Sequence, residues 1–156
     1  MAIYMKYGSI KGAVTTEGFK DWIELDSCKW AVGRRIGSAA RGSTNREGSE
    51  PSISEIAITK KYDVSSPKLM MEAMAGQLNS AVTIKFTTTT KDQVTDYLTY
   101  QLSNCGISGY GVGGDPPAES MSLNFTMVMV THKGLDPAES GNPQTVGYDL
   151  TKMKKV

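Results

Sequence analysis

The chain has 156 residues, 39% of them hydrophobic and 21% charged, which suits one compact domain over residues 1–156 and argues against global disorder. Its 17 basic and 16 acidic side chains leave a net charge of +1, so composition offers no basic surface for nucleic acid. The two cysteines, Cys28 and Cys105, are too few and too far apart for a disulfide framework or a metal cluster.

Alternation of apolar and polar residues with a period of two is the main pattern and predicts a mostly β structure. A first strand is expected over residues 3–7. A longer one over residues 22–34 changes its apolar parity near Asp26, as a bulge would produce. Further strands are expected over residues 56–63, 82–87 and 94–102, with a short piece around Ile107.

One helix is expected after Ser65 and Ser66, because Ser is a favoured N-cap and Pro67 suits the first turn. Gly76 is placed to end it. Residues at helical spacing form an apolar stripe, which predicts that this face packs into the core. The stripe consists of Leu69, Met70, Ala73 and Met74.

Residues 121–131 read as one long strand with Met121, Leu123, Phe125, Met127 and Met129 on its apolar face. Its second face is polar at first and then carries Val128 and Val130, with His132 on the same parity. That half is therefore expected to be covered on both sides, either by another part of the fold or by a neighbouring subunit. A last strand is expected over residues 146–150.

Two stretches have no periodic pattern: residues 37–51, rich in Gly, Ser and charge, and residues 109–118, rich in Gly and Pro. A structureless loop of about 15 residues is uncommon in a compact domain and is often functional. Many strands and one helix predict a small β-barrel of two packed antiparallel sheets, with one flanking α-helix and a long extended loop.

Catalytic chemistry finds no support in the residue pattern. His132 is the only histidine and has no placed partner for a nucleophile–base pair. Gly109, Gly111 and Gly114 match G-x-G-x-x-G, but Asp115 and two prolines follow where a nucleotide-binding helix would have to begin. We expect no enzyme activity, no cofactor and no metal.

Several segments, in order along nearly the whole chain, resemble the haemolysin-coregulated protein (Hcp) family of type VI secretion systems. The most specific is the Ser-Ser-Pro-Lys-Leu helix start, set between characteristic strands. The matching segments are Ile10-Lys11-Gly12, Trp22-Ile23-Glu24-Leu25, Cys28-Lys29-Trp30, Ile58-Thr59-Lys60, Asp63 to Leu69, Glu119, Ser122-Leu123-Asn124-Phe125 and Gly147-Tyr148-Asp149-Leu150.

The resemblance implies a structural subunit of the secretion system's inner tube. Such subunits form homo-hexameric rings, which stack into a tube inside a contractile sheath and are expelled behind a spike protein. The ring lumen can shelter small effector proteins, and the family's lumen position in the second strand falls on Lys29.

Two contact regions follow from combining the resemblance with the pattern. We expect Val128, Val130 and His132 at the interface between subunits of a ring. We expect the loop over residues 37–51 to contact the next ring, through Ser43, Arg46, Glu47 and Glu50.

The N-terminus lacks a signal-peptide pattern, and no apolar run of about 18 residues could span a bilayer. We therefore expect assembly in the cytoplasm, then secretion without a cleaved signal peptide, and no insertion into a membrane. Two alternatives stay open: a phage-like tail-tube protein, and a monomeric β-sandwich binding module. The second should expose a cluster of aromatics, which Tyr97, Tyr100 and Tyr110 do not obviously form.

Overall fold

The computed structural model describes residues 1–37, 50–134 and 142–156, and all structural statements concern these ranges. Twelve strands and one helix follow one another along these parts of the chain. They are β1 (Ala2–Tyr7), β2 (Ile23–Leu25), β3 (Ser27–Lys29), β4 (Val32–Gly33), β5 (Ser52–Ile53), β6 (Ile56–Lys61), α1 (Ser66–Ala75), β7 (Ser80–Thr90), β8 (Gln93–Gly113), β9 (Ala118–Asn124), β10 (Met127–His132), β11 (Gln144–Asp149) and β12 (Lys154–Lys155).

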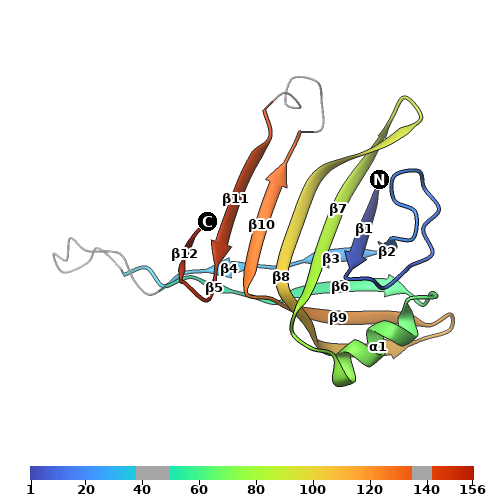
Figure 1. Ribbon diagram of the computed structural model, residues 1–156, viewed down its shortest axis with the longest axis horizontal. Helices are drawn as coiled ribbons and strands as arrows, with labels where there is room; N and C mark the ends of the chain where they lie inside the picture. The colour runs from blue at the N-terminus through green and yellow to red at the C-terminus, as the bar shows by residue number, and fades with distance from the viewer. Residues whose placement is uncertain (38–49, 135–141) are drawn as a thin grey trace.

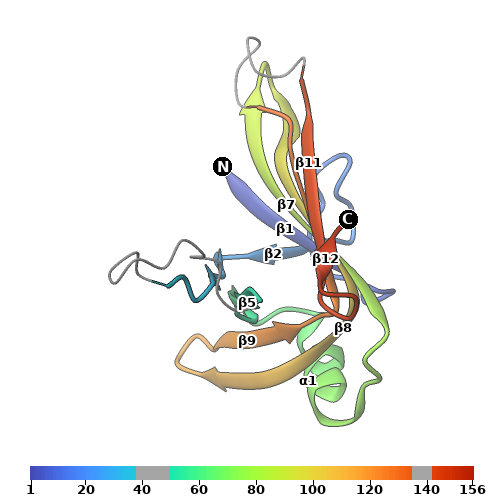
Figure 2. The same cartoon turned by 90° about the vertical axis from the view of Figure 1, so that its left-hand side faces the viewer.

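The larger of two packed sheets, here called the large sheet, has the strand order β12-β11-β10-β8-β7-β1-β2. All its neighbouring strands are antiparallel. The sheet stands upright in Figure 1, and Figure 2 shows it nearly edge-on. Because the strand order is linear, β12 and β2 lie at opposite ends of this sheet.

The small sheet consists of β3, β6, β9 and the second half of β8, and it lies below the large sheet in Figure 1. Strand β8 belongs to both sheets, because its residues up to Cys105 pair with β7, while Gly106–Gly113 pair with β9. Strands β4 and β5 form a separate two-stranded pair. The mainly β fold with two packed antiparallel sheets and one flanking helix is confirmed, whereas most of the expected extended loop lies outside the described residues.

The core fills the space between the two sheets. Alternate residues of β6 and β9, among them Ile58 and Leu123, meet alternate residues of β7 and β1, among them Ile84 and Met5. Each of these side chains is almost completely buried, which is worth roughly 1.5–3 kcal/mol per residue relative to exposure. The period-two alternation in the sequence therefore marks the inward faces correctly.

The chain passes between the sheets at two bends. At Asp26 the chain leaves β2, which pairs with β1, and enters β3, which pairs with β6. This change of sheet accounts for the change of apolar parity expected near Asp26. At Thr126 it leaves β9 for β10. The prediction of one strand over residues 121–131 is therefore wrong. The Thr126 hydroxyl accepts a hydrogen bond from the Asn104 side chain of β8 at 2.9 Å, which ties this bend to the strand shared by both sheets.

The expected Gly- and Pro-rich loop over residues 109–118 is also mostly strand. Strand β8 continues to Gly113, and β9 starts at Ala118. Small residues fit here because Gly109 and Gly111 pair closely with Ser122 and Ser120 of β9. Composition alone made this segment resemble a loop.

A second, smaller apolar cluster covers the outer face of the large sheet near β1 and β2. The segment between these strands folds back so that Val14 and Phe19 pack on Tyr4. The rings of Tyr4 and Phe19 are 4.9 Å apart, and Trp22 meets Phe19 edge-on at 5.3 Å. This packing holds the chain leading into β2 against the sheet.

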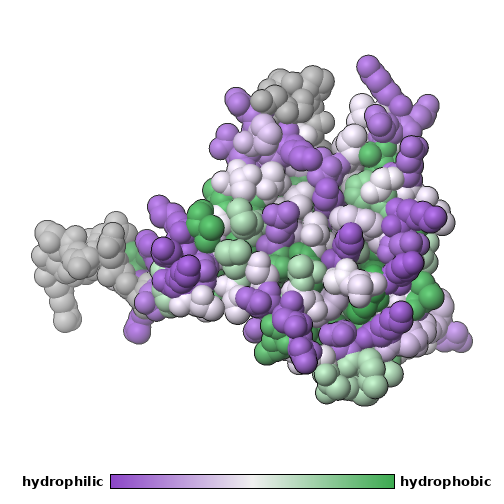
Figure 3. All heavy atoms as spheres, in the orientation of Figure 1, coloured by the Kyte–Doolittle hydropathy of each residue, from purple (hydrophilic) through white to green (hydrophobic). Residues whose placement is uncertain are grey.

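Helix α1 begins at Ser66 and is followed by Gly76, so its predicted start and end are confirmed. The predicted apolar stripe is only partly correct. Leu69 is fully buried and Ala73 packs on the core, but Met70 and Met74 are 36% and 71% exposed. The helix lies at the edge of the fold and packs mainly on β8, so only a narrow strip of its surface is covered. Apolar side chains consequently reach the surface along α1 at the lower edge of Figure 3.

Two truncations on this helix test its orientation. Leu69→Ala removes a fully buried side chain and is expected to lower the free energy of unfolding by about 2–5 kcal/mol. Met74→Ala, one and a half turns further along, changes an exposed side chain and is expected to change it by less than about 0.5 kcal/mol. Urea unfolding followed by circular dichroism measures both, and equal losses would contradict this orientation.

Candidate functional site

Lys29 lies at the end of β3 with its side chain exposed. Its neighbours Cys28 and Trp30 are partly buried and pack against the core, and the Trp30 ring meets Tyr100 edge-on at 5.9 Å. The predicted alternation is therefore confirmed, and Lys29 points away from the core, on the outer face of the small sheet. Whether that face lines a ring lumen stays a prediction.

The outer face of the small sheet forms a shallow groove of ≈ 490 Å³ beside Lys29. Small and mostly polar side chains cover it, since every second residue of these strands points outward. They include Ser27, Thr59, Gly109, Gly111, Ser120 and Ser122. A broad, shallow, weakly charged surface of this kind suits contact with another protein better than chemistry on a small substrate.

The three residues predicted at the subunit interface have different environments. Val128 is 3% exposed and belongs to the core of its own chain, facing Leu102 of β8. Val130 is partly buried against the same core, and His132 is exposed at the end of β10. The bend at Thr126 explains this, because it turns the even-numbered residues of β10 toward the core. A contact of Val130 and His132 with a neighbouring subunit stays a prediction.

The predicted stacking residues are mostly beyond what the structure describes. Ser43, Arg46 and Glu47 fall outside the described residues. Glu50 is exposed just before β5. Their role in stacking stays a prediction.

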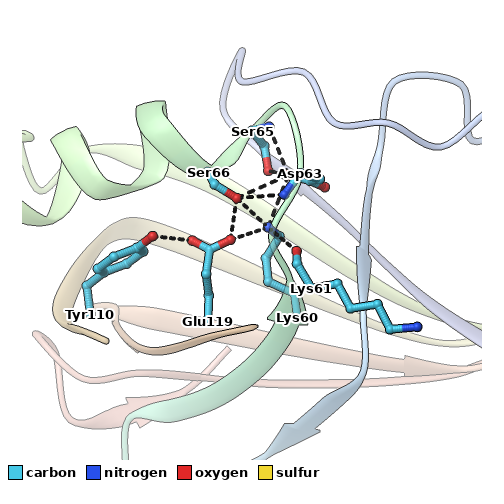
Figure 4. A network of polar contacts seen from close by, with 7 residues as sticks. All are labelled: Lys60, Lys61, Asp63, Ser65, Ser66, Tyr110 and Glu119. Carbon is cyan, nitrogen blue, oxygen red and sulfur yellow. Dashed lines mark hydrogen bonds and ion pairs between the residues drawn. The ribbon is translucent and has the colours of Figure 1, made fainter. Parts of the chain in front are cut away.

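A buried ionic cluster joins β6, β9 and the start of α1 (Figure 4). The Lys60 ammonium, fully buried, lies 2.6 Å from a Glu119 carboxylate oxygen and 3.0 Å from an Asp63 carboxylate oxygen. It also donates to the Lys61 carbonyl at 2.9 Å and contacts the Ser66 hydroxyl at 3.1 Å. Every hydrogen of the ammonium group therefore has an acceptor within reach.

The carboxylates of the cluster are satisfied as well. Glu119 accepts hydrogen bonds from the Ser66 hydroxyl and, on its other oxygen, from the Tyr110 hydroxyl. Burial and this carboxylate raise the pKa of Tyr110 well above its usual value, so Tyr110 is a donor at neutral pH. Asp63 accepts from the Ser65 amide at 2.8 Å and from the Ser65 hydroxyl. The predicted N-cap residue thus contacts Asp63 instead of making a side-chain cap.

The sequence predictions do not include this cluster. A signal was present in the alternation. Lys60 continues the inward parity of Ile56 and Ile58, and Glu119 that of Met121 and Leu123. The two charged residues are direct partners in the β6–β9 register. Opposite charges at inward positions of paired strands would have predicted a buried ion pair.

Within residues 1–37, 50–134 and 142–156, no group of three or more His, Cys, Asp or Glu side chains is arranged to hold a metal ion. No helix in these parts of the chain is long and apolar enough to cross a membrane. The described parts of the chain have broad sheet faces, exposed strand ends and an internal ionic cluster.

Comparison with known proteins identifies the family to which the chain belongs. The family model described as "Type VI secretion system effector, Hcp" matches residues 4–132. The chain therefore belongs to the Hcp family of type VI secretion systems. It is 24% identical to protein hcp1 of Pseudomonas aeruginosa over 154 residues, which cover 95% of this chain and 94% of that protein.

Solved structures share the fold. A type six secretion system protein superposes with a TM-score of 0.88 at 23% identity, covering 99% of both chains. Hcp1 from Salmonella typhimurium superposes with a TM-score of 0.76 at 18% identity over the whole of both chains. Hcp1 from E. coli EAEC 042 gives a TM-score of 0.79 at 16% identity, covering 96% of this chain and 99% of that one. At these identities the likeness establishes the fold.

The ionic cluster predicts an asymmetric response to mutation. Lys60→Met leaves Glu119 buried without its cation and should lower the free energy of unfolding by about 3–5 kcal/mol. The double variant Lys60→Met/Glu119→Leu removes both charges and should recover much of that loss. Lys61→Met, at the exposed neighbouring position, is the control and should change stability by less than about 0.5 kcal/mol. Chemical unfolding measures these three variants and Glu119→Leu alone. A double variant that loses as much stability as Lys60→Met and Glu119→Leu together would contradict the coupling.

Proposed function

We propose that this chain is the subunit of a type VI secretion inner tube and acts by assembly, without catalysis. The observation that carries the proposal is the match to the Hcp family model over residues 4–132, with a shared fold over nearly the whole chain. In this proposal six copies form a ring, and rings stack into a tube. The tube travels inside a contractile sheath behind a spike protein.

Physical features of the subunit support ring formation. The large sheet is open at both ends in the described parts of the chain, with β2 at one end and β11–β12 at the other. Open sheet edges invite pairing with another chain, and a closed ring with head-to-tail contacts covers each such edge with its complement. The ring would then be a way of satisfying edges that a free subunit exposes.

We further propose that the groove beside Lys29 faces the ring lumen and contacts small effector proteins. Its support is the exposure of Lys29 over a face of small polar side chains, which can accommodate varied partners without one fixed pocket. Assembly takes place in the cytoplasm, and the expelled tube carries the subunit out of the cell without a cleaved signal peptide.

The proposal predicts the mass and symmetry of the purified protein. We expect a particle of six chains, each of 16.8 kDa, by mass photometry, and six-fold rings by negative-stain electron microscopy. Serial dilution across the micromolar range provides the control for concentration-dependent association. A species of 16.8 kDa at every concentration would contradict the tube function.

The stacking loop, predicted from sequence, gives a second test. Deleting residues 43–50 should leave six-fold rings intact while abolishing their stacking into tubes, because this segment is proposed to contact the next ring. Replacing the same eight residues with a Gly-Ser segment of equal length separates the effect of chemistry from that of length. Electron microscopy of rings induced to stack measures tube length, and tubes of normal length from the deletion would refute the role of the loop.

A further inference from the structure

The two ends of the large sheet cannot meet within one subunit. Five strands lie between the end strands in the order β12-β11-β10-β8-β7-β1-β2, and six intervals of about 4.8 Å place the ends roughly 29 Å apart along the sheet. Figure 1 shows β11 and β12 on one side of the molecule and β1 and β2 on the other. A contact between the β11–β12 end and the β2 end therefore requires a second copy of the chain.

The end formed by β11 and β12 is basic. Lys152, Lys154 and Lys155 are all exposed there, and we call these three residues the basic end. The nearby carboxylate of Asp149 is engaged locally, since it accepts hydrogen bonds from the backbone amides of Thr151 and Lys152 at 2.9 and 3.2 Å. Apolar side chains accompany the charges, because Val146 and Val156 are 66% and 61% exposed.

The opposite end is acidic. Glu24 of β2 and Asp26 just after it are exposed, and we call these two residues the acidic end. Lys61 lies near them and offsets part of their charge. A hollow of ≈ 370 Å³ adjoins the two carboxylates, and its mixed polar and apolar lining includes Ile3, Phe86 and Tyr97.

The charges at both ends are available for an outside partner. Ion pairs among the described residues use three lysines, Lys60, Lys85 and Lys133, and three acids, Asp63, Asp96 and Glu119. None of these belongs to the basic or the acidic end. The large sheet thus carries exposed lysines at its β12 end and exposed carboxylates at its β2 end, outside the ion pairs of the described residues.

We propose that the basic end of one copy docks on the acidic end of the next copy, so that Lys154 and Lys155 face Glu24 and Asp26. The exposed valines then meet the apolar part of the hollow beside these carboxylates. This seam rests on the proposed ring function and specifies its contact. Like ends repel each other, so the charges also select the head-to-tail direction that a ring requires over a symmetric dimer.

Charge reversal at either end tests the seam. Lys154→Glu/Lys155→Glu makes both ends acidic, and Glu24→Lys/Asp26→Lys makes both ends basic. Each double variant alone should reduce the ring fraction by about tenfold at a fixed micromolar concentration and about 0.1 M salt, where screening is incomplete. Mixed together, the two variants can alternate around a six-membered ring with every seam complementary, so mixing should restore rings. Mass photometry measures the ring fraction in each sample.

The control is Lys68→Glu/Lys91→Glu, which changes the net charge by the same amount as Lys154→Glu/Lys155→Glu, at exposed positions on α1 and on the β7–β8 turn. It should leave the ring fraction unchanged. Circular dichroism checks that all variants are folded, and restoration on mixing is itself evidence that both double variants keep the native fold. Rings at wild-type level in both separate double variants, or loss without restoration on mixing, would overturn the seam. A wild-type chain that never forms rings would instead overturn the proposed function.

Discussion

The buried contact between Lys60 and Glu119 is the constraint on which the arrangement of this molecule depends. Two opposite charges enclosed in an apolar interior are tolerated only when they meet each other and when their remaining hydrogen-bonding groups are satisfied. Ser66 at the start of α1 and Tyr110 of β8 complete the contact, so strands of the small sheet, the helix and the strand shared by both sheets converge on one point. Moving any one of these elements would leave a charged or polar group unpaired in the core.

The small sheet, held in place by this contact, covers only part of the large sheet. The chain passes between the sheets at Asp26, at Thr126 and along β8 after Cys105, so the packed region is limited to the strands near these three places. Strand β11 extends beyond the cover that the small sheet supplies, and Val146 is exposed there although it lies on the same face as Val130. The exposed ends of the large sheet are therefore a product of how the core is built, and they are the surfaces that form the proposed seam.

The sequence pattern correctly predicted the strands and helix boundaries that depend on local structure. Alternation identified strands such as the one at Val82, Ile84 and Phe86, and the Ser-Pro start and Gly76 bounded the helix correctly. Alternation indicates which residues point inward, but it does not indicate which sheet a strand joins. The sequence therefore predicted one continuous strand across Thr126, where the chain in fact passes from one sheet to the other. Helical spacing likewise does not reveal how wide a strip is covered, and the exposed Met74 follows from the peripheral place of α1. The candidate surfaces at Lys29 and at the sheet ends depend on such non-local packing, and only the orientation of Lys29 was accessible beforehand.

Charges at the sheet ends have a role in the free subunit as well as in the proposed ring. An apolar edge would associate with any exposed strand, whereas lysines and acids on an edge remain hydrated in the free subunit and discourage indiscriminate pairing. The same charges become favourable when the complementary end of another copy approaches, because attraction then acts between opposite signs over a short distance. A closed ring leaves neither end unmatched, whereas an open chain of any length keeps one basic and one acidic end exposed. In the proposed ring, exposed charges of opposite sign at the two ends of the sheet would thus favour closure over an open chain.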